Sequence, residues 1–126
     1  MISKAEGNYI RMSPTKIRLV ADLVKGKTVE KALYILDNAN KRSAVPIKKV
    51  LNSAFSNANH NRQDKFLPTD LCISKITSDG GPMLHRYRAA TMGRAAVVKH
   101  RTSFIHVELD EVVKSKKTKA KKTGSK

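Results

Sequence analysis

The stretch that decides the fold runs from residue 80 to residue 104 and reads GGPMLHRYRAATMGRAAVVKHRTSF. It contains five Arg or Lys residues, two His residues and three glycines, but no carboxylate. Residues 71–78 before it are rich in β-branched and apolar side chains, and residues 104–110 after it alternate apolar with polar ones, which predicts two strands. A structureless connection of about 25 residues is unusual in a compact domain. We therefore predict that the strands continue outward as a long antiparallel hairpin with its tip near residues 89–93.

Three amphipathic helices are predicted before this hairpin, over residues 13–25, 28–39 and about 43–59. In each segment apolar side chains recur three and four positions apart, which places them on one helix face. Ser and Thr precede the first two segments at capping positions. A weaker extended pattern over residues 2–10 indicates a third strand. The predicted fold class is α+β: three helices packed on a small antiparallel sheet, with a long protruding β-hairpin and a disordered basic C-terminal tail.

The chain length of 126 residues allows one domain with one modest core. We predict that this domain spans residues 1–113 and includes the hairpin arm at about residues 79–102. The tail, residues 114–126, has seven lysines, no acid and no large apolar side chain. Such a segment cannot offset its own ordering entropy, so it is expected to be disordered in isolation.

The charge of the chain predicts a polyanionic partner. There are 26 basic against 10 acidic residues, which gives a formal net charge of +16. Nucleic acid is the favoured partner. No membrane interaction is expected, because the sequence has no apolar run of about 18 residues and its amino terminus lacks the apolar core of a signal peptide. The predicted location is the cytoplasm or the interior of an organelle.

The residue inventory argues against an enzyme. The sequence has no glycine-rich phosphate loop ending in Gly-Lys-Ser/Thr, no His-Glu-x-x-His motif and no clustered carboxylates. Cys72 lies between two apolar residues and is predicted to be a buried, inert thiol. The four histidines, His60, His85, His100 and His106, lack metal-ligand spacing. We therefore predict no catalytic residue, no metal and no cofactor. A hydrolase that uses Cys72 or a histidine is kept as one alternative, and a DNA-compacting or DNA-regulating protein as another.

Arginines on the arm can make forked hydrogen bonds to phosphate, and its glycines permit close backbone approach. Tyr87 either stacks on a base or covers a neighbouring strand residue. Lys16 on the first helix and Arg11 just before it have no nearby acidic partner, whereas Arg18 can pair with Asp22 four residues later. These cations are therefore candidate phosphate contacts.

The third helix carries a polar stripe of Lys49, Ser53, Asn57 and His60. No Asp or Glu occurs between residues 38 and 63, so this face can approach sugar and phosphate with little repulsion. A merely hydrated helix surface is an equally good interpretation.

Three segments of the sequence resemble a known family. SPTKIRLVADLVKGK (13–27), VLNSAFSNANHN (50–61) and DGGPMLHRYRAATMGRAAVVKHRTSFIHVEL (79–109) together resemble the bacterial type of the large-subunit ribosomal protein twenty-two family. The resemblance extends from about Met12 to Glu111 without an obvious gap. It implies an α+β body on the outer surface of the large subunit, and a hairpin that reaches inward to line the nascent-polypeptide exit tunnel.

The resemblance also implies partners and site residues. The expected partners are large-subunit ribosomal RNA, neighbouring ribosomal proteins and the nascent polypeptide at the hairpin tip, with a single copy per ribosome, no homo-oligomer and no cofactor. The expected location is the cytoplasmic large ribosomal subunit, with an organellar ribosome as the alternative. Residues from the arm, from the Ser-Pro-x-Lys-x-Arg signature and from the Asn-Ala-x-His-Asn signature join the candidates above. The predicted rRNA-binding residues are Arg11, Ser13, Lys16, Arg18, Lys49, Asn57, His60, Asn61, Arg86, Arg88, Arg94, Lys99 and Arg101. The predicted tunnel tip consists of Ala89, Ala90, Thr91, Met92 and Gly93.

The tip departs from the family pattern. Where the family commonly has Arg-Pro-Arg-Ala-x-Gly-Arg-Ala, residues 88–95 of this chain are RAATMGRA. The chain therefore lacks the stiffening proline and one tip arginine.

Overall fold

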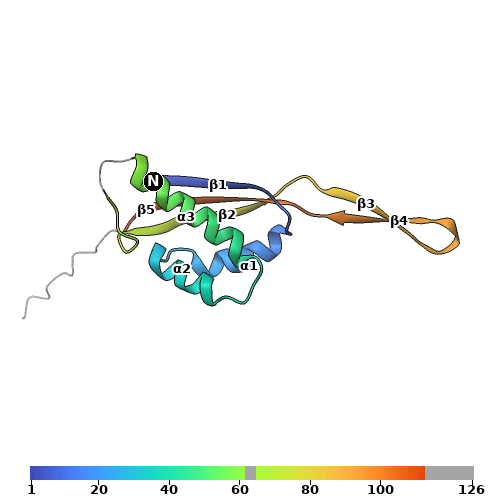
Figure 1. Ribbon diagram of the computed structural model, residues 1–126, viewed down its shortest axis with the longest axis horizontal. Coiled ribbons are helices and arrows are strands. Elements are labelled where there is room, and N and C mark those ends of the chain that lie inside the picture. The colour runs from blue at the N-terminus through green and yellow to red at the C-terminus, as the bar shows by residue number, and fades with distance from the viewer. Residues whose placement is uncertain (62–64, 113–126) are drawn as a thin grey trace, which may run out of the picture.

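Three helices cover one face of a three-stranded antiparallel sheet in the computed structural model, and a separate two-stranded arm extends from the end of that sheet (Figure 1). The structure describes residues 1–61 and 65–112. The sheet has the strand order β1-β5-β2, and the arm is the antiparallel pair β3-β4. The strands are β1 (Ser3–Ile10), β2 (Leu71–Gly80), β3 (Leu84–Ala89), β4 (Ala95–His100) and β5 (Ser103–Glu111), and the helices are α1 (Pro14–Val24), α2 (Val29–Asn38) and α3 (Ala44–Asn61).

The predicted fold class is confirmed, and so are its three helices and three sheet strands. Helix α1 begins at Pro14, where a missing N–H costs nothing, and it ends before Gly26, which has a φ of 70°. Thr28 precedes α2, as predicted, although neither Ser13 nor Thr28 makes a side-chain capping hydrogen bond. The predicted disordered tail, residues 114–126, lies outside the described residues.

The core lies between the helices and the sheet. Strand β5 is central, and its alternate residues Ile105, Val107 and Leu109 are fully buried against the helices. Helix α1 contributes Ile17 and α3 contributes Ile47 to the same cluster. Burying each of these large aliphatic side chains stabilises the fold by about 1.5–3 kcal/mol. The core therefore forms entirely within the body, which we define as the described residues 1–81 and 102–112.

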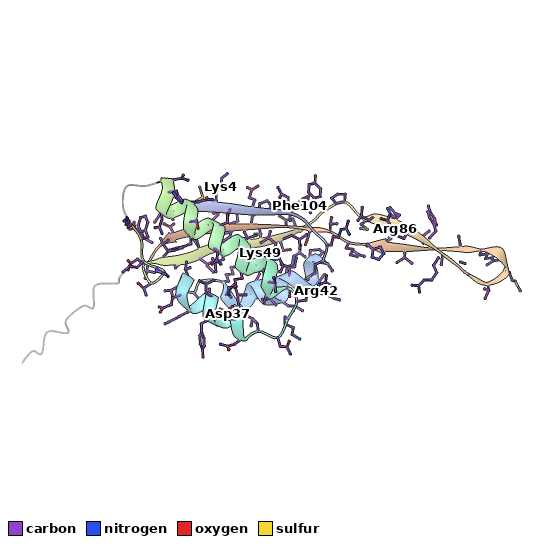
Figure 2. The ribbon with its side chains drawn as sticks, viewed as in Figure 1. Lys4, Asp37, Arg42, Lys49, Arg86 and Phe104 are labelled. Carbon is purple, nitrogen blue, oxygen red and sulfur yellow. The ribbon has the colours of Figure 1, made fainter. Side chains whose placement is uncertain are left out.

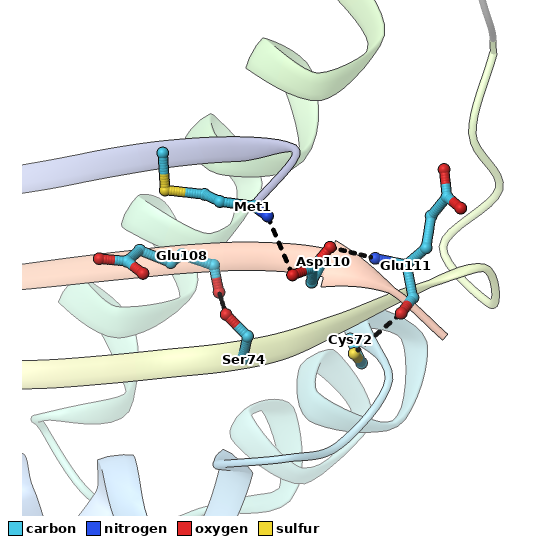
Figure 3. A network of polar contacts seen from close by, with 6 residues as sticks. All are labelled: Met1, Cys72, Ser74, Glu108, Asp110 and Glu111. Atoms are coloured by element: carbon cyan, nitrogen blue, oxygen red, sulfur yellow. Dashed lines mark hydrogen bonds and ion pairs between the residues drawn. The ribbon is translucent and has the colours of Figure 1, made fainter. Parts of the chain in front are cut away.

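The prediction that Cys72 is buried is wrong. Strand residues alternate between the two faces of a sheet, so Leu71 and Ile73 point into the core while Cys72 points away from it. The thiol is half-buried, and its Sγ lies 3.7 Å from the carbonyl oxygen of Glu111 (Figure 3). In a strand that is covered on one face only, a residue between two buried neighbours therefore points away from the core.

The same end of the sheet is held together by polar contacts (Figure 3). The amino-terminal ammonium group of Met1 donates to Asp110 at 3.0 Å, which joins β1 to β5. The Ser74 hydroxyl donates to the carbonyl oxygen of Glu108 at 3.5 Å, which joins β2 to β5. These contacts lie at the end of the body opposite the arm (Figures 1 and 3).

The arm leaves the body through a tight root. The backbone N–H of Gly81 donates to the carbonyl oxygen of Thr102 at 3.0 Å, and the Thr102 hydroxyl donates to the carbonyl oxygen of Pro82 at 2.6 Å. A Cβ on Gly81 would lie 2.5 Å from the Thr102 hydroxyl oxygen. Gly81 is therefore required by contacts within the chain, a role that differs from the expected close approach to phosphate.

The tip of the arm lies where the sequence predicts it. The strands end at Ala89 and restart at Ala95, and the backbone N–H of Ala90 donates to the carbonyl oxygen of Arg94 at 2.8 Å. Met92 and Gly93 have φ values of 55° and 69°. Only Gly adopts this region without steric cost, so the conformation of Met92 is an uncommon one.

Gly7 allows α3 to cross close to β1. A Cβ at this position would lie 2.6 Å from Cγ2 of Val50 and 3.3 Å from Cδ1 of Ile10. Val50 is β-branched and lies in α3, so its side chain has little freedom to move aside. Replacing Gly7 therefore forces α3 away from the sheet.

We expect Gly7→Ala to destabilise the chain by about 1–2 kcal/mol, because overpacking outweighs the smaller entropy gain in the unfolded chain. Urea unfolding of the purified protein measures the effect. Gly80→Ala is the matched control, since a Cβ there meets no atom within 4 Å. Adding Val50→Ala should remove most of the Gly7→Ala penalty in a double-mutant cycle, and additive effects of the two substitutions would contradict the steric explanation.

Candidate nucleic-acid interface

The arm exposes its cations without neutralising them. Between residues 82 and 101, all of which the structure describes, no side chain is buried. Arg86 and Arg88 lie opposite Val98 and Ala96, on one face of the ribbon, while Lys99 lies opposite His85 on the other face. Within the described ranges 1–61 and 65–112, no carboxylate is close enough to any arm cation to form an ion pair. The arm therefore offers positive charge on both faces.

Tyr87 does not cover a packed core. It is 72% exposed and lies opposite Val97, which is also exposed. The ring is thus accessible for stacking. In the alternative, the ring packs on its cross-strand neighbour Val97.

The structure brings the start of α1 next to the base of the arm. A hollow of about 440 Å³, which we call the arm-base hollow, is lined by Arg11 and Ser13 from the α1 side and by Arg86, Lys99 and Arg101 from the arm side. These residues are about 75–90 positions apart in the sequence, and all five are predicted binding residues. Sequence reasoning identified them separately, and the fold gathers them.

A second hollow lies between α1 and the loop that connects α2 to α3. This α1 hollow measures about 490 Å³, and its cationic residues are Arg11, Lys16, Lys41 and Arg42. Figure 2 shows Arg42 at the end of the body nearest the arm. Lys41 and Arg42 were not among the predicted residues. A signal for them was present, because they are adjacent cations in the acid-free interval between residues 38 and 63.

Arg18 does not form its main contact with Asp22. Its Nε donates to the carbonyl oxygen of Ser78 at 2.9 Å, which ties α1 to β2 close to the arm root. The hypothesis of a local Arg18–Asp22 pair is therefore replaced by a contact between elements. A role for Arg18 in RNA binding stays a prediction.

The predicted residues on α3 form a separate group. Lys49, His60 and Asn61 are exposed, and Lys49 is labelled on α3 in Figure 2. Asn57 is half-buried, and its side-chain amide donates to the carbonyl oxygen of Lys4 at 3.1 Å, at the edge of β1. None of these four residues lines the arm-base hollow or the α1 hollow. These predicted α3 residues therefore lie outside the surface that joins α1 to the arm.

Carboxylates gather instead on the open face of the sheet. His106 lies between Glu6 and Asp79, with its Nδ1 3.6 Å and its Nε2 3.8 Å from their carboxylate oxygens. Lys75 lies 3.7 Å from Glu108 on the same face. This face carries charge of both signs, in contrast to the arm and the two hollows. Among the described residues, the arm and the lining of the two hollows therefore carry charge of positive sign only.

Two further findings concern other kinds of site. None of the helices in residues 1–61 and 65–112 is long and apolar enough to cross a membrane. Within those residues no three His, Cys, Asp or Glu side chains are grouped so that they could hold a metal ion.

An α+β body with a projecting cationic ribbon, and with basic hollows at the base of that ribbon, is the arrangement of a nucleic-acid-binding protein. The comparison with protein families makes the assignment specific. The model of the family "Ribosomal protein L22p/L17e" matches residues 5–110, and the chain belongs to this family. It is thus a structural ribosomal protein and not an enzyme, as the sequence resemblance predicts.

Curated relatives agree with this assignment over nearly their whole length. The chain is 49% identical to large ribosomal subunit protein uL22 of Syntrophomonas wolfei over 111 residues, which are 88% of this chain and 96% of the relative. It is 48% identical to the protein of the same name from Syntrophus aciditrophicus over 113 residues, covering 88% and 99%. The protein of that name from Halothermothrix orenii is 42% identical over 111 residues, covering 88% and 96%.

Proposed function

We propose that this chain is a structural component of the large ribosomal subunit that binds large-subunit rRNA, aids its assembly and lines the nascent-polypeptide exit tunnel with the tip of its arm. The relatives named above are large-subunit proteins, which supports this role. The observation that carries the proposal is the arm itself. It projects from the body, buries none of its side chains and holds only cations as charged groups.

The arm requires an external partner to be held in one position. An isolated two-stranded ribbon is marginally stable in water, because it has no third element to pack against. Phosphate groups on either side of the ribbon would both neutralise its cations and immobilise it. The predicted binding residues Arg86, Arg88, Arg94, Lys99 and Arg101 serve this purpose in the proposal.

The body extends the same binding surface. Arg11, Ser13 and Lys16 line the two hollows at the base of the arm, so an RNA segment that follows the arm meets them next. Lys49, His60 and Asn61 on α3 line neither hollow and would contact another segment. Recognition of backbone and shape, more than of base sequence, suits these contacts. One chain would then hold several RNA segments in a fixed arrangement.

The tip is the proposed contact with the nascent polypeptide. Its residues Ala89, Ala90 and Thr91 have small side chains. Met92 is 94% exposed at the far end of the arm, so its side chain is available for contact. A flexible thioether side chain adapts to many apolar partners. The proposed partners also include neighbouring ribosomal proteins, and we expect one copy of the chain per ribosome.

Sedimentation combined with RNA crosslinking tests this function. In cell extract fractionated on a sucrose gradient, we expect the chain to sediment with the large ribosomal subunit and to crosslink through Arg88 or Arg94 to tunnel-wall rRNA. Sedimentation with chromosomal DNA would instead support the alternative of a DNA-compacting protein. Sedimentation as a free small protein would contradict both.

A further inference from the structure

The α1 hollow combines apolar and cationic side chains in one lining. Its lining includes two exposed leucines, Leu19 and Leu23, which are 67% and 51% exposed. It also includes four cations: Arg11, Lys16, Lys41 and Arg42. None of the described residues that line the hollow is acidic. The lining of the hollow is therefore partly apolar and strongly cationic.

The two leucines are not part of the core. Helix α1 buries its opposite stripe, which includes Ile17 and Val24, against the sheet and the other helices. Leu19 and Leu23 are four residues apart, so their side chains are neighbours on the outer surface of the helix. A single exposed leucine is ordinary, but an adjacent exposed pair that lines a hollow is a surface suited to a ligand.

We propose that the α1 hollow binds one unstacked nucleotide of the large-subunit rRNA, with its base on Leu19 and Leu23 and its flanking phosphates on the four cations that line the hollow. This inference rests on the proposed function, because it specifies which part of the RNA this surface holds. It adds that the contact is made by a base removed from its stack, and not by the backbone alone.

The chemistry of the hollow selects this occupant over simpler ones. A phosphate backbone by itself would satisfy the cations but leave both leucines in water. An apolar protein segment would cover the leucines but leave four cations without counter-charge, at a cost when they are partly desolvated. An unstacked nucleotide supplies a flat, largely apolar face and negative charge in one unit. The planar guanidinium groups of Arg11 and Arg42 are also able to stack on a base.

The size of the hollow fits the same occupant. Its volume of about 490 Å³ lies within the range of about 300–1,000 Å³ typical of small-ligand sites. Sequence-specific RNA recognition commonly uses such extruded bases in loops and bulges. The hollow thus offers one position at which the chain could recognise a base and not only a shape.

The test is nucleotide-resolution chemical probing of large-subunit rRNA bound to the full-length chain, with wild-type protein and a Leu19→Ser/Leu23→Ser variant. We expect the wild-type protein to change the reactivity of one unpaired nucleotide, and the variant to lose that change. The variant should also bind about tenfold more weakly, from the loss of one base contact. Its salt dependence should remain that of the wild type, because no cation is removed.

Tyr34→Ser/Val45→Ser is the matched control, since both residues are exposed apolar side chains outside this hollow. It should leave RNA affinity and the reactivity pattern unchanged. Thermal unfolding checks that each variant is folded. Should the Leu19/Leu23 variant unfold, zero-length crosslinking of the wild-type complex gives an independent result, with a nucleotide adduct expected on α1 or on residues 41–43.

The outcomes separate this inference from the proposed function. If the wild-type chain fails to bind rRNA at all, the proposed function itself is wrong. If the wild-type chain binds but the Leu19/Leu23 variant matches it in affinity and reactivity pattern, only the nucleotide site is refuted.

Discussion

The affinity of the intact chain for large-subunit rRNA is expected to fall about 10³-fold between 50 and 200 mM salt. Each phosphate neutralised by a cation contributes a slope of roughly −0.7 to −0.9 in a plot of log affinity against log salt concentration, since binding releases condensed counterions. The arm, the arm-base hollow and the α1 hollow present more than six exposed cations, and six phosphate contacts suffice for a fall of this size.

Filter binding or fluorescence anisotropy over a series of salt concentrations measures this slope. Duplex DNA of equal length is the comparison, because a chain that recognises folded RNA should retain a preference for it at every salt concentration. A slope near zero would contradict the electrostatic basis of the proposed interface. Equal affinity for duplex DNA would contradict RNA shape recognition while leaving the charge argument intact.

Much of the fold follows from local sequence patterns. The apolar residues of α1 recur every three or four positions because one stripe of that helix is buried. The periodicity therefore predicts which side chains pack in the core. The alternation in β5 likewise records one buried and one open face. The arm was predicted on different grounds. The two sheet strands that flank it are separated by about 25 residues, which is too long for an ordinary loop in a compact domain.

Three features that sequence reasoning missed depend on tertiary geometry. The contact of Arg18 with the carbonyl oxygen of Ser78 joins residues 60 positions apart, and no pattern in either segment indicates it. Gly7 is required because α3 happens to cross β1 at that position. Lys41 and Arg42 join Arg11 and Lys16 only because the loop between α2 and α3 lies beside α1. Cationic residue types were recognisable from the sequence, but their grouping was not.

The error at Cys72 has a simple physical origin. Apolar flanking residues indicate burial in a helix interior or in a strand that is covered on both faces, whereas β2 is covered by helices on one face only. In such a strand the residues on either side of a buried residue point away from the core. The alternation of β5 already indicated a sheet with one open face, and the same argument applied to β2 would have placed Cys72 correctly.

Replacing residues 83–100 by Asn-Gly is expected to leave the body folded and to weaken rRNA binding by on the order of 10²-fold or more near physiological salt. The Asn-Gly replacement is compatible with the strand pairing at the base of the arm. Gly80 pairs with Ser103, and the N–H of Gly81 donates to the carbonyl oxygen of Thr102. Continuing this register places Pro82 opposite Arg101, a separation that a two-residue type I′ turn closes. No buried side chain is removed, so the free energy of unfolding should change by less than about 1 kcal/mol.

The binding loss in that variant has a specific signature. Four cations leave with the arm, Arg86, Arg88, Arg94 and Lys99, so the salt slope should become shallower by about 3. The matched control keeps the arm and changes these four residues to Gln, which removes the charge without removing the ribbon. If the Gln variant reproduces the change in slope, charge on the arm accounts for the binding. If the Gln variant binds like the wild type while the Asn-Gly variant does not, the ribbon contributes through its shape and its uncharged groups. Loss of cooperative urea unfolding in the Asn-Gly variant would instead show that the arm supports the core, which would contradict the division of the chain into a self-sufficient body and an RNA-held arm.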